Sequence, residues 1–236
     1  MPNAPADPIV EELAAHLRAT RQAERGLFGA LDPAVRDAPL RPGDWSPKDH
    51  QAHLTAWKAR QVERFHAART GEQPSVADEA ETDAINADLQ AARAGWPWEQ
   101  IEAEADQVSA RLEEELRRVD PALLRDSERL VGTTFGNGPY HALTHFGWIV
   151  DAGVGDPARV ATFTAELERL TAASQLPERD RGAALYNLAC YHALSGGLDR
   201  AKALVREAFA LRPDLIEWAD HDSDLDAIRE ELPQLR

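Results

Sequence analysis

The stretch Pro139-Tyr-His-Ala-Leu-Thr-His-Phe-Gly-Trp148 decides how the rest of the chain is interpreted. Pro139 suits the first position of a helix, and the residues after it favour a helix. His141 and His145 are four residues apart, so their imidazoles lie on one helical face, one turn apart. Two imidazoles placed in this way can share one cation if a neighbouring helix supplies a third ligand.

A candidate for the third ligand lies upstream in Trp45-Ser-Pro-Lys-Asp-His-Gln-Ala-His-Leu-Thr-Ala-Trp57. Ser46 and Pro47 predict a helix start, because a serine side chain can cap free backbone amides and proline fits the first turn. His53 lies inside this predicted helix. If the two helices are neighbours, the nitrogens of His53, His141 and His145 converge on one divalent metal. Three protein ligands and an open position are typical of catalytic metal sites.

Helical periodicity dominates residues 1–155, and no segment alternates long enough to predict a strand. The predicted long helices cover residues 9–31, 47–69, 99–119 and 139–152, with a shorter one near residue 85. The fold class is therefore all-α, a four-helix bundle of the kind that holds metal sites on facing helices. Residues 121–138 are expected to form a loop, in which Phe135 and Gly136 would give a movable rim.

The remaining histidines and the lone cysteine are predicted to have structural roles and not to bind a metal or react. A surface position is predicted for His16, His50, His66 and His221. His192 and Cys190 are predicted to pack inside a C-terminal helix. No side chain is assigned as a general base, and Asn86 and Tyr140 are the weak candidates for the pocket.

Several side chains near the predicted ligands have two interpretations. Asp49 lies one turn before His53 and either orients its imidazole or faces solvent. Trp57 and Trp148, each within about one turn of a predicted ligand, either line a pocket beside the metal or fill the space and seal it.

Composition excludes several classes of partner. The formal net charge is −15, spread over both halves of the chain, and there is no basic stripe for nucleic acid or anionic membranes. One cysteine allows no internal disulfide and no thiolate metal cage. There is no secretory signal and no apolar run near the roughly 18 residues that a membrane span needs. We therefore expect a cytoplasmic protein without nucleic-acid or membrane partners.

The last 80 or so residues follow a different pattern, with small residues at regular helical spacing. The spacing of a tetratricopeptide repeat is matched by Leu188, Ala189, Gly196, Ala201, Ala208 and Pro213. The sequence thus predicts two domains, a bundle over residues 1–155 and a tetratricopeptide-like unit over residues 156–236. A single repeat has exposed ends, so this unit is expected to pack on the bundle or on itself.

Residues 1–155 resemble the DinB-like (DinB/YfiT) superfamily of metal-binding four-helix bundles. The resemblance rests on Trp45-Ser46, on Ala52-His53-Leu54 with Trp57, and on His141-x-x-x-His145-x-Gly147. It implies a divalent metal held by His53, His141 and His145, with water in the free positions. The chain departs from the pattern at Trp148, where relatives often have glutamine.

The resemblance implies a hydrolase or a thiol-dependent transferase acting on a small-molecule substrate, because related bundles include both. Zinc, nickel and ferrous iron all accept imidazole ligands, and the sequence does not choose among them. One alternative is a non-enzymatic module that binds a protein partner through the C-terminal unit. Another is a metal-free resistance protein, since some relatives act without metal. A homodimer stays open.

Overall fold

The computed structural model describes residues 7–73 and 82–236. The chain divides into two compact units between Phe163 and Thr164, inside helix α9 (Pro157–Ala172). The domain division at residue 155 and the repeat assignment remain predictions.

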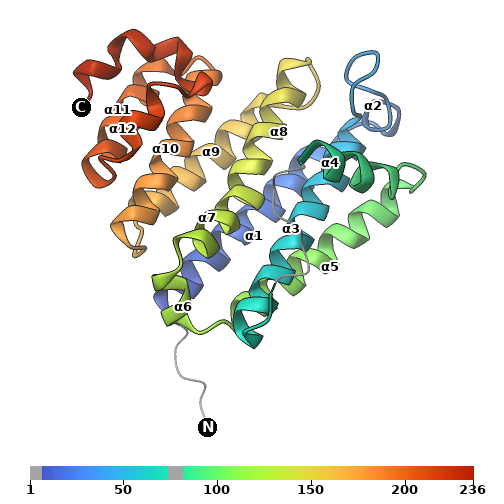
Figure 1. The fold of residues 1–236 in the computed structure, drawn as a ribbon. Coiled ribbons are helices and arrows are strands. Elements are labelled where there is room, and N and C mark those ends of the chain that lie inside the picture. Colours follow the sequence, from blue (N-terminus) through green and yellow to red (C-terminus); the bar gives the residue numbers. More distant parts are fainter. Residues whose placement is uncertain (1–6, 74–81) are drawn as a thin grey trace. The chain divides into compact units, whose positions relative to one another are not determined.

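The first unit is a helix bundle, which confirms the predicted fold class (Figure 1). Its helices are α1 (Pro8–Phe28), α2 (Pro33–Arg36), α3 (Pro47–Thr70), α4 (Thr82–Ala91), α5 (Trp98–Leu116), α6 (Pro121–Asp126), α7 (Glu128–Asn137) and α8 (Pro139–Asp151). Helices α1, α3 and α5 pack on one another, and α7 and α8 pack against α3. The described ranges contain no strand. Fully buried apolar side chains such as Leu54, Phe65 and Phe146 form the core.

Helix α3 begins and ends where the sequence predicts. The Ser46 hydroxyl accepts from the Asp49 amide at 3.1 Å, and the Asp49 carboxylate accepts from the Ser46 amide at 2.9 Å. This reciprocal cap satisfies two backbone donors that would otherwise have no partner. At the other end, Gly71 has a φ of 75° and stops the helix in the left-handed conformation that favours glycine.

The prediction of a loop over residues 121–138 was wrong, because this segment forms α6 and α7. Asp120 and Ser127 cap the two helices through their side-chain oxygens. Val131 and Phe135 on α7 are buried, so Phe135 belongs to the core and not to a movable rim. Burial of this apolar face outweighs the low helix propensity of the glycines on the other.

Gly138 separates α7 from α8 and lets the chain pass close to α1. A Cβ atom there would lie 2.7 Å from the carbonyl oxygen of Thr134 and 3.1 Å from Leu17. Such contacts leave no room for a side chain. Pro139 then begins α8 with its φ already set for a helix.

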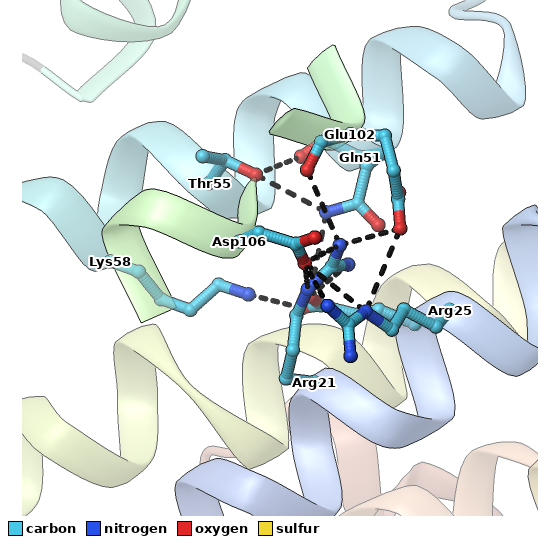
Figure 2. Close-up of polar contacts among 8 residues, drawn as sticks. Arg21, Arg25, Gln51, Thr55, Lys58, Glu102 and Asp106 are labelled. Carbon is cyan, nitrogen blue, oxygen red and sulfur yellow. Dashed lines mark hydrogen bonds and ion pairs between the residues drawn. The ribbon is translucent and has the colours of Figure 1, made fainter. Parts of the chain in front are cut away.

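A cluster of charged side chains crosses the bundle interior between α1, α3 and α5 (Figure 2). Lys58 and Glu24 are both buried and form a hydrogen-bonded ion pair. Arg21 connects this pair to α5 by donating to Glu102 at 2.6 Å and to Asp106 at 2.8 Å. Each buried charge therefore has an opposite charge beside it.

The second unit is built around the helical hairpin of α10 (Glu178–Leu194) and α11 (Leu198–Leu211). Gly196 turns the chain between them with a φ of 82°. The short helix α12 (Leu215–Ala219) and the 3₁₀ segment η2 (Ser223–Gln234) complete the unit, and η2 packs on both hairpin helices.

The interior of the second unit confirms that Cys190 is buried, and its thiol lies 3.7 Å from the Asp222 carboxylate. Burial raises the pKa of the Cys190 thiol, which makes it a poor nucleophile. The His192 side chain is partly buried. It also makes a polar contact, because its Nε2 lies 2.7 Å from Oε1 of Glu168.

Within the described parts of the chain, no helix combines the length and the apolar character that crossing a bilayer requires.

Candidate metal centre

Helices α3 and α8 bring the predicted histidines together inside the first unit. Nε2 of His141 lies 3.1 Å from Nε2 of His53 and 3.1 Å from Nε2 of His145. One nitrogen from each of the three residues falls within 4.8 Å of the others. The i, i+4 pair on α8 thus shares one face, and α3 supplies the third imidazole opposite it.

The environment keeps these imidazoles neutral at physiological pH. Burial lowers the pKa of His53 to about 4 and that of His141 to about 3. Burial also lowers the pKa of His145 well below its usual value. Neutral imidazole is the form that binds a metal ion, so the electrostatics of the site suit ligation.

The donor set fits a divalent cation on geometry as well as on charge. Two nitrogens that each lie about 2.0–2.1 Å from one zinc ion are roughly 3 Å apart. The two Nε2 contacts made by His141 have this separation. One imidazole Nε2 cannot donate a proton to both neighbours, whereas a shared cation satisfies all three lone pairs.

The prediction that His50 lies on the surface was wrong. His50 is buried, and its Nδ1 lies 2.6 Å from Nδ1 of His145. A helix brings residues three apart to neighbouring positions on one face, so the spacing of His50 and His53 was the signal for it. The surface position predicted for His16 was also wrong, since this side chain is buried. Its Nδ1 donates to the backbone oxygen of Glu12, and its ring packs on Phe135.

Three tryptophans surround the histidines. The Trp45 ring lies 4.7 Å from that of His53, and the Trp148 ring lies 4.6 Å from that of His145, centroid to centroid. Trp148 is nonetheless 52% exposed, so it does not seal the site. Trp57 is buried, and its indole donates to Asn86 at 3.1 Å. Asn86 therefore fixes the position of Trp57.

The Asp49 carboxylate is occupied in the cap of α3, where it also accepts from the Ser46 hydroxyl at 2.6 Å. Its role in the structure is to hold the start of the helix that carries His50 and His53. Tyr140 is buried beside Phe135, with ring centroids 5.5 Å apart.

A pocket of about 300 Å³ lies beside the histidines within the same unit. Its lining includes Trp57, Gly132, Thr133, Gly136, Asn137 and His141. His141 thus belongs both to the histidine cluster and to the wall of a cavity. A ligand in this pocket would contact a residue of the candidate metal centre directly.

The comparison with protein families agrees with this geometry. The family model of the DinB superfamily matches residues 16–149, which include all three histidines, the whole of α3 and all but the last two residues of α8. The chain belongs to the DinB superfamily. Searches of the curated proteins and of the solved structures gave no match. Membership covers the DinB bundle only, and the second unit lies outside the matched residues.

Proposed function

We propose that this DinB protein is a divalent-metal-dependent enzyme, a hydrolase or a thiol-dependent transferase, that acts on a small molecule. His53, His141 and His145 would hold the metal through Nε2. The observation that carries the proposal is that His141 lines the pocket while its Nε2 lies among the three converging nitrogens. A purely structural metal site would have no such cavity beside it.

The metal would supply Lewis acidity, which lowers the pKa of a bound water or thiol and polarises a carbonyl. The protein's own residues would do the rest. Trp57, held by Asn86, and the polar Thr133 and Asn137 would position the substrate. Trp45 and Trp148 would shield the imidazoles in part from water. Zinc, nickel and iron all suit three imidazoles.

Metal analysis of the untagged, purified protein tests the proposal. We expect about one divalent ion per chain in the natural protein and a large loss in His141→Ala. His221→Ala is the matched control, because His221 is exposed in the second unit. Folding of His141→Ala should be kept, since the apolar core does not depend on the ion. Full metal content in His141→Ala would contradict the ligand assignment.

A second candidate is a non-enzymatic module that binds a protein partner through the second unit. It is supported by the exposure of Leu194 (60%) and Trp218 (66%), two large apolar side chains of that unit. Absence of metal from the natural protein would favour this candidate, and a homodimer is one form it could take.

A further inference from the structure

The pocket beside His141 is lined on the α7 side by two glycines whose presence helix packing does not explain. Gly132 and Gly136 are one turn apart on α7 and both line the pocket. A Cβ atom added at either position would meet no atom of the described residues within 4 Å. Glycine destabilises a helix interior relative to alanine, so two such residues in α7 need a reason.

Two other helix-associated glycines, Gly138 and Gly182, have a packing reason. A Cβ at Gly138 would lie 2.7 Å from the carbonyl oxygen of Thr134. A Cβ at Gly182 would lie 2.5 Å from the side chain of Arg212. At Gly132 and Gly136, the space that a side chain would fill is the pocket itself. The backbone of α7 is therefore left bare toward the cavity.

The other described residues that line the pocket include no aspartate, glutamate, lysine or arginine. They contribute the indole of Trp57, the hydroxyls of Thr82 and Thr133, the amide of Asn137 and the imidazole of His141. The guanidinium of Arg60 lies 5.1 Å from the centre of the Trp57 ring and helps to hold the indole. Asn137 is held in turn by donating to Gln61 at 3.4 Å.

We propose that this pocket binds an uncharged, partly apolar part of the substrate against the bare backbone of α7. Gly132 and Gly136 determine specificity by leaving room for it. In the metal-free protein, the described lining offers an ionised group no opposite charge in place of its lost hydration. The volume is at the small end for small-molecule sites, so the bound part is small. This inference rests on the proposed function for the identity of the pocket as the substrate site.

The test uses the full-length, metal-free protein and three probes of similar size: benzyl alcohol, benzoate and benzylamine. Binding is followed by NMR, through the amide signals of Gly132 and Gly136 and the indole signal of Trp57. Gly136→Leu fills the pocket and Gly136→Ala fills it in part. Gly95→Leu is the matched control, because a Cβ at Gly95 also meets no described atom within 4 Å and Gly95 is not among the described residues that line the pocket.

We expect benzyl alcohol to shift these signals and the two charged probes to leave them unchanged. Gly136→Leu should weaken benzyl alcohol binding by about tenfold or more, and Gly136→Ala by less. Gly136→Ala should also raise the midpoint of thermal unfolding, since alanine favours the helix. Gly95→Leu should bind benzyl alcohol as the natural protein does.

The inference is overturned if benzyl alcohol does not bind, if a charged probe binds as well, or if both Gly136 variants bind it unchanged. Cobalt binding, measured separately by absorbance, distinguishes this failure from failure of the proposed function. A protein that binds cobalt and not benzyl alcohol would refute the pocket inference alone. A protein that binds benzyl alcohol and no cobalt would refute the metal centre alone.

Discussion

His50 links the candidate metal centre to the start of α3. If Nε2 of His145 is a ligand, its Nδ1 carries the proton and donates to Nδ1 of His50, 2.6 Å away. Such a bond fixes the tautomer and the ring orientation of a ligating imidazole. His50 is thus assigned as a positioning residue, one step removed from the metal.

Replacement of His50 tests this role. His50→Ala should weaken zinc binding by about 10–100-fold, because His145 loses the acceptor that orients it. His50→Asn should restore much of the affinity, since the asparagine oxygen can occupy a position near that of Nδ1. The measurement is competition with a chelator, with unfolding followed in parallel. Equal zinc affinity in all three proteins would show that His50 only packs.

The buried histidines also predict a dependence of stability on pH. Burial lowers the pKa of His50 and His53 to about 4, below the ordinary value of 6.5. Below pH 6.5 the unfolded chain therefore binds protons that the folded chain does not, and the free energy of unfolding falls. Each histidine contributes at most about 1.4 kcal/mol per pH unit.

Urea unfolding of the metal-free protein checks this dependence. The measurements run from about pH 7 to about pH 4, which spans the ordinary and the lowered pKa values of histidine. We expect a loss of stability that starts below pH 6.5 and continues toward pH 4. His50→Gln/His53→Gln should show a shallower loss, because glutamine does not titrate. A steeper loss in that variant would contradict the assignment.

The convergence of the three candidate ligands could be predicted in large part from the sequence, because their spacing and chemistry are local. His141 and His145 share a helical face at any tertiary arrangement, and only their meeting with His53 required the fold. His50 was missed because its partner, His145, lies on another helix. The i, i+3 spacing of His50 and His53 places both on one face of α3, but the contact of His50 with His145 depends on how α3 and α8 pack.

At the scale of single helices, α3 has two functions on different faces. It carries His50 and His53 toward α8, and it carries Lys58 into the charged cluster with Glu24 and α5 (Figure 2). Burial lowers the pKa of Lys58, and the adjacent Glu24 carboxylate opposes that effect. Truncation of Lys58 leaves the Glu24 carboxylate buried without its ammonium partner, with the Arg21 guanidinium 3.6 Å away as the remaining opposite charge.

A double-mutant cycle tests the pair. Lys58→Met should lower the free energy of unfolding by about 3–5 kcal/mol, because the Glu24 carboxylate keeps its burial and loses its ammonium. Lys58→Met/Glu24→Leu should recover most of that loss. Arg169→Met is the control, since Arg169 and Glu166 form an exposed pair expected to contribute less than about 1 kcal/mol. Losses that simply add in the double variant would exclude coupling.

Helix α7 shows where prediction from local sequence stopped. Its start signal, Ser127, and its buried face with Val131 and Phe135 are present in the sequence, but Gly132, Gly136 and Gly138 indicate a loop. The glycines are compatible with a helix because the opposite face is buried. The ion pairs of Arg21 with Glu102 and Asp106 could not be predicted from a single sequence either, because no local sequence pattern indicates that α1 packs on α5.

At the scale of the whole molecule, the two compact units divide within a helix. Phe163 and Leu167 are one turn apart on α9, both are buried, and the boundary falls between them. If the part of α9 that belongs to the first unit unfolds, the helical residues at the start of the second unit lose the turn that precedes them. We expect the two units to unfold together for this reason.

Hydrogen exchange with and without zinc measures whether they do. Zinc at about 100 times its dissociation constant should stabilise the first unit by about 2.7 kcal/mol. Amides of α3 and α8 that exchange through global unfolding should then exchange more slowly. If the units unfold together, the slowest amides of α10 and α11 should slow by the same factor, although His53, His141 and His145 are all in the first unit. His141→Ala with zinc is the control and should show neither change. Slowing confined to α3 and α8 would contradict the coupling, because zinc binding would then stabilise the first unit without stabilising the second.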